Sequence, residues 1–323
     1  MSLVTRYEVR PNDSIDSIAA RFKTTPAAVI EANGGTLLWI GKVLWVPTGG
    51  NGGPQQPQGQ TGRPFLRTIQ PQLNTFVSEI LNPAQTGRDE FELRLKLPLF
   101  LEKIDSAPNG TIDLAARKYV SVVPWPMGTF ETFKADAKAK AERFWSFRFK
   151  IWPPAEYSFF NWPGGPGGQP KGVACTLSVF YTLSRQGASF RIKCYRRAAG
   201  ETTASLDSGN WTDSILSDQA HDELVDKSGT KVPTRNITVA HEIGHLLGLD
   251  HSAANAIGCT GSEMVCYGDG GEAWQIRNIM GAGDEVNKSN AKPWWERIVQ
   301  HTGVPKEQWT VYTLDSNGNP KYL

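Results

Sequence analysis

The chain has 323 residues, of which 39% are hydrophobic and 20% are charged, and its formal net charge is +2. This length suits two domains, and the composition is that of a globular protein with enough apolar residues for a core. The net charge argues neither for nor against a nucleic-acid partner, but the chain has no long basic run, so no such partner is expected. The longest apolar run, around residues 96–101, is too short to cross a bilayer and is broken by Pro98, so no membrane span is expected.

Residues 4–47 predict a small unit whose elements follow the order strand, helix, helix, strand. The first helix, residues 14–22, repeats apolar side chains at helical spacing after two polar capping residues. The second helix begins at Thr25-Pro26, a cap followed by a proline in the first turn. The two strands are expected at residues 7–9 and 43–46.

Three pieces of this unit, YEVRPNDSIDSIAARF, TPAAVIEAN and GKVLWVP, together resemble a LysM domain, which we place at residues 1–48. LysM domains bind polymers that contain N-acetylglucosamine, and peptidoglycan is expected here ahead of chitin. The resemblance implies a shallow groove lined by Asn12, Asp13, Ser14, Ile15 and Asn33. The same polar residues also suit helix capping, and Asn12 stands where the family usually has glycine. LysM-like modules also serve as structural parts of phage tails and injection machines.

Residues 49–64 consist largely of Gly, Pro, Gln and Asn, which predicts a flexible linker. Residues 65–125 then contain alternating stretches such as EFELRLKL and YVSVVPW, which predict strands. Their role stays open between an added subdomain, a pro-segment, and extra strands of the sheet in the domain that follows.

Residues 126–323 predict a domain of mixed α and β structure, which makes the whole chain an α+β protein. The stretch 129–147 places apolar side chains on one face and lysines on the other, as an amphipathic helix does. The segments VACTLSVFYTLS and SFRIKCY flank residues 185–188 and predict a hairpin. A last helix is expected at residues 293–303.

The segment HEIGHLLGLDH, residues 241–251, holds three of the five histidines of the chain. His241 and His245 are one helical turn apart and project from the same side of a helix. His251 would face away from a continuous helix, but Gly248 can adopt a positive φ, end the helix and return the chain so that the three imidazoles converge. Three protein nitrogens with a fourth position left open are typical of catalytic zinc. Glu242 is then the expected general base.

This pattern, HExxHxxGxxH, resembles the metzincin clan of zinc peptidases, and Ser252 after the third histidine resembles its matrixin branch. The resemblance implies a catalytic domain with a mixed sheet, an active-site helix, a methionine turn and a C-terminal helix around one Zn²⁺ ion. It implies that Met280, in RNIMG, forms the turn beneath the metal, with Met264 as the alternative. The turn lacks the tyrosine that astacin-like members use, so no residue is assigned to the oxyanion.

Four cysteines allow two disulfides. Cys259 and Cys266 are close enough in sequence to pair, and buried free thiols are the alternative. Asp269 and Glu272, in YGDGGEAW, offer oxygen ligands for Ca²⁺, and a solvated acidic loop without an ion is the simpler interpretation.

Together these patterns predict a zinc-dependent endopeptidase that a LysM domain targets to peptidoglycan or chitin, where it cleaves wall-associated proteins or peptide stems. The alternative is a structural or effector component of a phage-tail-like or secretion apparatus that delivers a peptidase or cell-wall hydrolase. The first residues show no secretory signal. We therefore expect the protein to act outside the cytoplasm, as a secreted, periplasmic or envelope-delivered protein, by a route other than the general secretory one.

Overall fold

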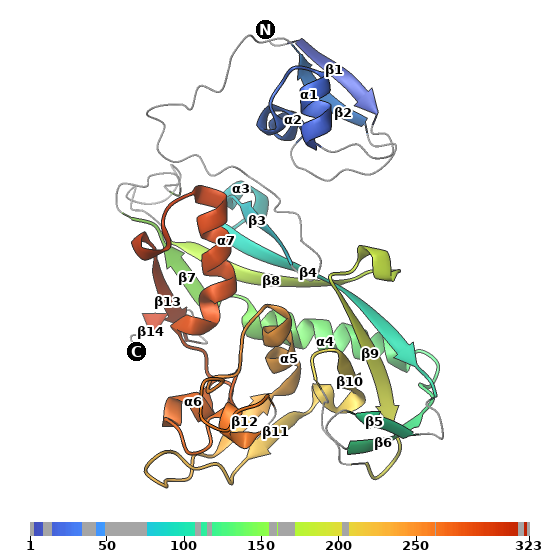
Figure 1. The fold of residues 1–323 in the computed structure, drawn as a ribbon, viewed down its shortest axis with the longest axis vertical. Helices are drawn as coiled ribbons and strands as arrows, with labels where there is room; N and C mark the ends of the chain where they lie inside the picture. Colours follow the sequence, from blue (N-terminus) through green and yellow to red (C-terminus); the bar gives the residue numbers. More distant parts are fainter. Residues whose placement is uncertain are drawn as a thin grey trace.

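A computed structural model shows a protein of mixed α and β structure with a curled mixed sheet (Figure 1). None of its described helices is both long and apolar enough to cross a membrane. The residues that the structure describes are 3–8, 15–33, 43–48, 76–106, 111–114, 118–154, 160, 172–201, 207–261, 263–315 and 320–321.

The N-terminal unit has the predicted order of strand, helix, helix and strand. Its two strands pair in an antiparallel register, and the hydroxyl of Thr25 accepts a hydrogen bond from the backbone N–H of Ala28 at 3.2 Å, as a helix cap does. A small apolar core joins the elements and consists of Tyr7, Ile18, Ala19, Val29 and Val46. The elements are β1 (Leu3–Glu8), α1 (Ile15–Arg21), α2 (Pro26–Asn33) and β2 (Val43–Thr48).

The rest of the described chain is built on one sheet of ten strands. Their order is β14-β13-β7-β8-β4-β9-β6-β5, with β3 paired to β4 and β10 paired to β9. The strands are β3 (Val77–Leu81), β4 (Glu92–Ile104), β5 (Thr111–Leu114), β6 (Lys118–Val123), β7 (Phe149–Trp152), β8 (Val173–Tyr181), β9 (Phe190–Arg197), β10 (Asn210–Thr212), β13 (Thr310–Leu314) and β14 (Pro320–Lys321).

Strand β4 is the central strand of this sheet. Alternate leucines along it point into the core, as the alternating sequence predicts. It pairs with β3 and also with β8 and β9, which follow it by many residues. The described strands within residues 65–125, β3 to β6, belong to the same sheet as strands further along the chain. The buried leucines are Leu93, Leu95, Leu97, Leu99 and Leu101.

The predicted hairpin between β8 and β9 is wrong. Both strands run parallel to β4, and the connection between them crosses that strand. The N–H of Thr182 bonds to the carbonyl of Leu99, and the N–H of Ser189 bonds to the carbonyl of Pro98. Parallel strands side by side normally need a long connection that returns the chain to its starting end. Here β8 pairs with the first half of β4 and β9 with the second half, so a short connection is enough.

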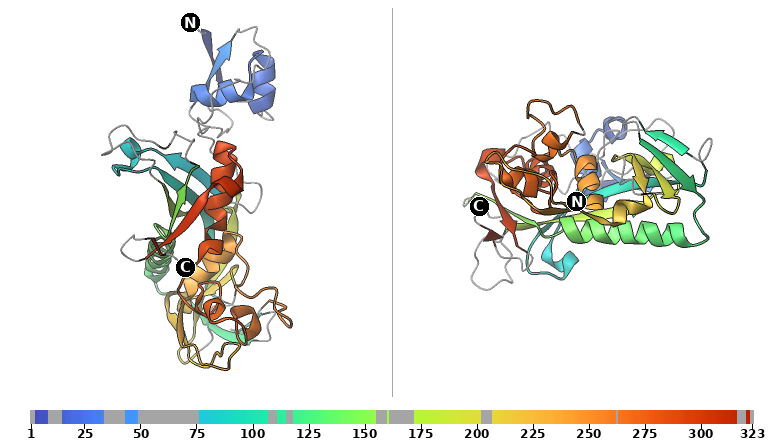
Figure 2. Two further views of the ribbon diagram at one scale, coloured as in Figure 1. Left: turned by 90° about the vertical axis from the view of Figure 1, so that its left-hand side faces the viewer. Right: turned by 90° about the horizontal axis from the view of Figure 1, so that it is seen from below.

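Helix α4 (Thr129–Trp145) runs alongside the sheet, as the right-hand view of Figure 2 shows. The apolar face predicted for this helix is buried. At its end, the indole N–H of Trp145 donates to the carbonyl of Ala240 at 2.9 Å, which fixes α5 (Thr238–Leu246) beside α4. The buried residues of the predicted face are Phe130, Phe133, Ala137, Ala141 and Phe144.

The remaining elements are short helices, 3₁₀ helices and a second, two-stranded sheet. The last predicted helix is α7 (Lys292–Thr302), which the indole N–H of Trp294 ties to the carbonyl of Thr176 in β8 at 2.8 Å. The other elements are α3 (Pro83–Thr86), η3 (Arg185–Gly187), η4 (Asp213–Leu216), the hairpin of β11 (Asp218–His221) and β12 (Thr234–Ile237), η5 (Met264–Tyr267), α6 (Ala273–Arg277), η6 (Lys288–Ala291) and η7 (Lys306–Gln308).

Candidate metal centre

Helix α5 ends at a glycine in the left-handed conformation. Gly248 has φ of 84°, its N–H bonds to the carbonyl of His245, and the N–H of Leu249 bonds to the carbonyl of Gly244. These two bonds form a Schellman motif, in which the residue at the turn is usually glycine because a side chain there is strained. The motif reverses the chain directly after the helix and returns His251 toward the helix face.

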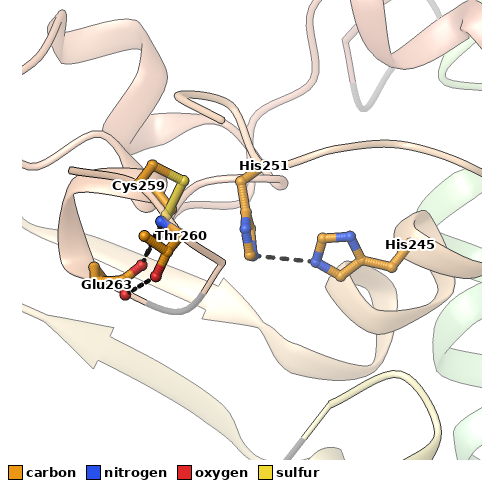
Figure 3. The surroundings of a disulfide bond; sticks show 6 residues. His245, His251, Cys259, Thr260 and Glu263 are labelled. Carbon is orange, nitrogen blue, oxygen red and sulfur yellow. Dashed lines mark hydrogen bonds between the residues drawn. A yellow bond between two sulfur atoms is a disulfide. The ribbon is translucent and has the colours of Figure 1, made fainter. Parts of the chain in front are cut away.

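The three imidazoles of the HEIGHLLGLDH segment meet at one point. The Nε2 atom of His245 lies 3.1 Å from Nε2 of His241 and 3.2 Å from Nε2 of His251. Figure 3 shows the rings of His245 and His251 pointing at each other from two separate segments. Nitrogens at 2.0–2.1 Å in tetrahedral geometry would be about 3.4 Å apart, so these spacings fit a zinc ion closely.

Two of the imidazoles are oriented by backbone carbonyls. Nδ1 of His241 donates to the carbonyl of Ile279 at 2.6 Å, and Nδ1 of His245 donates to the carbonyl of Leu249 at 2.9 Å. A carbonyl only accepts, so each Nδ1 carries the proton and each Nε2 presents its lone pair to the common point. Such outer partners are the usual support of histidine ligands.

Burial keeps these histidines uncharged. Together with the neighbouring His245, burial lowers the pKa of His241 to about 3 and the pKa of His251 to about 4. Burial also lowers the pKa of His245. Only a neutral imidazole can bind a metal through Nε2, so near neutral pH the cluster is ready to bind. In both geometry and protonation the donor set fits a single divalent ion.

Glu242 directly follows His241 in α5 and is buried. The residue is 8% exposed, and its carboxylate makes no hydrogen bond to the part of the chain that the structure describes. Burial, followed by the negative charge of Asp207, raises the pKa of Glu242 to about 8. A bound cation would lower this pKa again, because an opposite charge nearby favours the carboxylate.

Met280 lies against α5, at the turn of the helix that carries His241 and His245. It is 1% exposed, and its side chain contacts Gly244, between His241 and His245. The carbonyl of Met280 accepts a hydrogen bond from the N–H of Ser252 at 2.8 Å, which ties the turn to the residue after His251. The alternative methionine, Met264, is 38% exposed.

Tyr267 also belongs to this centre, although no motif in the sequence singles it out. Its ring stacks on the ring of His241, with centroids 5.5 Å apart and an angle of 18°, and lies 4.4 Å from the ring of His251. Burial, together with the charge of Glu242, raises the pKa of its phenol to about 12. The one local signal was its position directly after Cys266, the residue that closes the loop.

A disulfide joins Cys259 to Cys266 (Figure 3), and Tyr267 directly follows the loop that it closes. The carbonyl of Cys266 accepts from the N–H of Ala253, two residues after His251, at 3.1 Å. The disulfide occupies both sulfurs, so the nearby Cys259, Glu263 and Cys266 do not offer thiolate ligands to a metal. The end of the disulfide loop is thus hydrogen-bonded to the segment that follows the third histidine.

The two acids considered as calcium ligands, Asp269 and Glu272, both interact with other residues of the protein. Asp269 accepts a hydrogen bond from the N–H of Val225 at 3.0 Å, and Glu272 pairs with Lys227 at 2.5 Å. Within the described residues, neither acid belongs to a group that could hold a metal ion.

The predicted glycan groove falls mostly outside the described residues. The described residues do not include Asn12, Asp13 or Ser14. Ile15 is the first residue of α1 and is half-buried, and Asn33 is the last residue of α2.

Comparison with known proteins identifies the N-terminal unit. The family model of the LysM domain matches residues 7–47. This match supports the binding of N-acetylglucosamine polymers such as peptidoglycan or chitin, and a wall-associated role outside the cytoplasm. No curated protein and no solved structure matches the chain. The residues of the histidine cluster lie outside the LysM match.

Proposed function

We propose that this protein is a zinc-dependent endopeptidase with a metzincin-like catalytic domain, held at peptidoglycan by its LysM domain. The observation that carries the proposal is the meeting of three Nε2 atoms, with His245 at 3.1 and 3.2 Å from the other two, at a helix in which the buried Glu242 directly follows His241. Neutral imidazoles of this number and spacing favour zinc over the hard cations, which prefer oxygen ligands. Three ligands leave one position open to a substrate.

Zinc supplies Lewis acidity in such a centre, which polarises a carbonyl and lowers the pKa of water to about 7. The protein's own contribution then comes from Glu242. Its carboxylate takes the proton from the attacking water and delivers it to the leaving amine of the scissile peptide bond. Because the carboxylate makes no hydrogen bond to the described residues, it is free to exchange that proton.

The carbonyls of Ile279 and Leu249 hold two of the histidines in place during this reaction. They hold the Nδ1 atoms of His241 and His245 by hydrogen bonds of 2.6 and 2.9 Å, so that the rings do not rotate away. Tyr267 shields one side of the cluster from water by covering the rings of His241 and His251. A drier site strengthens the electrostatic interactions on which the reaction depends.

The LysM domain adds local concentration to this chemistry. Once the LysM domain is bound to the wall, a flexible linker keeps the catalytic domain close to substrates in the same wall. For short linkers the effective concentration of such substrates is in the millimolar range. The substrates of this proposal are wall-associated proteins and the peptide stems of peptidoglycan. Proteins are the usual substrates of the clan, and the LysM domain favours the wall.

The test compares the wild type with two variants by zinc content and by hydrolysis of casein and of purified sacculi. We expect one zinc ion per chain, lost on treatment with EDTA together with activity. Glu242→Gln should keep its zinc and lose hydrolysis by a factor of about 100 or more, because the general base is missing. Glu272→Gln, at an exposed acid that pairs with Lys227, is the matched control and should behave as the wild type.

Two results would contradict the proposal. One is a zinc-loaded wild type that cleaves neither casein nor sacculi. The other is a Glu242→Gln variant that cleaves them as fast as the wild type does.

A further inference from the structure

A cavity of about 490 Å³ opens beside the third histidine. It lies between the segment that follows α5 and the segments that carry α6 and η6, and both His251 and Met280 line it. Its volume falls within the range of ligand pockets, about 300–1,000 Å³. His251 belongs to both the cavity and the histidine cluster, so a group bound in the cavity would lie next to the site of hydrolysis.

The side chains around this cavity suit an uncharged polar ligand. Apart from His251, its charged or titratable lining residues are one acid, Asp250, and one base, Lys292, so their charges balance. Asp250, Asn255 and Lys292 are all exposed, and their side chains make no hydrogen bond or ion pair to the described part of the chain. Unengaged donors and acceptors at a pocket rim are the groups that bind hydroxyls and amides.

The polar side chains on the floor of the cavity already bond to each other, which makes the floor rigid. The side-chain amides of Asn278 and Asn290 bond to each other at 2.8 and 3.2 Å, and both residues are buried. The N–H of Met280 also donates to the side chain of Asn278 at 2.9 Å. The cavity is thus preformed, which reduces the entropic cost of binding.

One wall of the cavity is the indole ring of Trp274. This residue is 51% exposed, although large aromatic side chains are usually buried. Its position is fixed through the next residue, since the hydroxyl of Ser252 donates to the carbonyl of Gln275 at 2.8 Å and the side chain of Gln275 donates back to the carbonyl of Ser252 at 3.3 Å. The backbone that carries this exposed aromatic side chain is therefore tied to the segment that carries His251.

A flat aromatic face next to polar groups matches the chemistry of a sugar ring. The π-face of an indole is negative, and the C–H hydrogens on the face of a sugar are slightly positive, so the two pack together. The hydroxyl and N-acetyl groups at the edge of the sugar then remain available to the unengaged polar side chains at the rim. An apolar side chain of a bare protein would use the indole and leave those polar groups unpaired.

We propose that this cavity binds a sugar ring of a glycan-linked peptide, so that the protein cleaves peptides that are attached to an N-acetylated amino sugar. This inference rests on the proposed function and narrows its substrates to the peptide stems of peptidoglycan. The polymer that the LysM domain binds then also carries the scissile bond, and Trp274 distinguishes sugar-linked peptides from bare peptides.

The test uses the zinc-loaded full-length protein and two substrates with the same peptide, one linked to a disaccharide of N-acetylated amino sugars and one bare. Product analysis by mass spectrometry gives the ratio of the two kcat/KM values. We expect the wild type to prefer the sugar-linked peptide, and Trp274→Ala to reduce that ratio about tenfold, since one aromatic contact is lost. Trp274→Phe should retain most of the ratio because it keeps a flat ring.

Ile257→Ala is the matched control, because Ile257 is a fully exposed apolar residue of the loop after His251 that does not line the cavity. Its ratio should equal that of the wild type. The LysM domain is the same in every variant, so its own affinity for sugar cancels from the comparison. A wild type that cleaves both peptides equally well, or a Trp274→Ala variant with an unchanged ratio, would overturn the inference.

A binding measurement separates failure of this inference from failure of the proposed function. Calorimetric titration of the Glu242→Gln protein with the disaccharide-linked peptide should show two binding events per chain, one at the LysM domain and one at the cavity. Adding Trp274→Ala should remove one of them. If the wild type hydrolyses neither peptide, the proposed function fails. The titration still decides whether the cavity binds sugar. A single binding event that Trp274→Ala leaves unchanged would overturn the inference.

Discussion

Gly244 and Met280 are in direct contact beneath the histidine cluster. A Cβ atom built on Gly244 would overlap the sulfur of Met280 and would lie 3.2 Å from its Cε and from Cζ2 of the buried Trp145. Glycine inside a helix costs stability relative to alanine. The contact explains its presence, because the helix that carries His241 and His245 can approach the methionine only where a side chain is missing.

Gly244→Ala should therefore destabilise the protein. In an open helix this change stabilises by about 1 kcal/mol, whereas overpacking here should give a net loss of about 1–3 kcal/mol in the free energy of unfolding. Urea unfolding of the metal-free protein measures this loss. Adding Met280→Ala to Gly244→Ala creates room for the new methyl group, so the two changes should cost less together than the sum of their separate costs. A Gly244→Ala variant more stable than the wild type would contradict this packing.

Gly248→Ala should weaken both the fold and the metal centre. With φ of 84° an alanine there is strained by about 1 kcal/mol or more, although a Cβ at this position would meet no atom within 4 Å. Relief of that strain would shift His251, so zinc affinity should fall as well. Gly248→Asn should retain more of both properties, because asparagine tolerates this conformation.

Gly229→Ala is the control for that experiment. Gly229 has φ of 79° and equally open surroundings, but it lies in the turn Asp226–Thr230, away from the histidines in sequence. The two alanine variants should lose similar stability in urea, and only Gly248→Ala should lose zinc affinity in a competition titration with a chelator. Equal zinc affinity in both would show that the turn does not position His251.

Tyr267 should contribute through its ring. Its contacts with His241 and His251 involve the aromatic face, so Tyr267→Phe should keep zinc affinity within about twofold of the wild type, whereas Tyr267→Ala should lower it at least about tenfold as the rings lose support. The same chelator competition measures both variants. A Phe variant as weak as the Ala variant would indicate that the hydroxyl, and not the ring, is required.

The cysteines should differ sharply in reactivity. Burial raises the pKa of the Cys175 and Cys194 thiols, so both stay protonated at pH 8 and should not react with a thiol reagent in the folded protein. Unfolding returns their pKa values to about 8.5 and exposes them. A thiol count should therefore rise from zero to two on unfolding without reductant, and to four after reduction of the Cys259–Cys266 disulfide. Any reaction in the folded state would contradict the burial of these two thiols.

The sequence alone was enough to predict the features that depend on near neighbours in the chain. The apolar face of α4 and the two projecting histidines of α5 follow from the helical repeat. The return of His251 follows from a glycine whose missing Cβ allows the left-handed turn at Gly248. The N-terminal order of strand, helix, helix and strand is local in the same sense, and the LysM match confirms the identity of that unit.

Only the tertiary structure decided which distant segments meet. Alternation along β4, β8 and β9 determines which side chains face the core, but it does not choose the partner of a strand, so a hairpin was predicted where the chain crosses β4. The carbonyl of Ile279 reaches His241, and Tyr267 covers two imidazoles, because loops far along the chain pack against α5. Such contacts depend on long-range burial and loop closure, for which a linear sequence has no periodic signal.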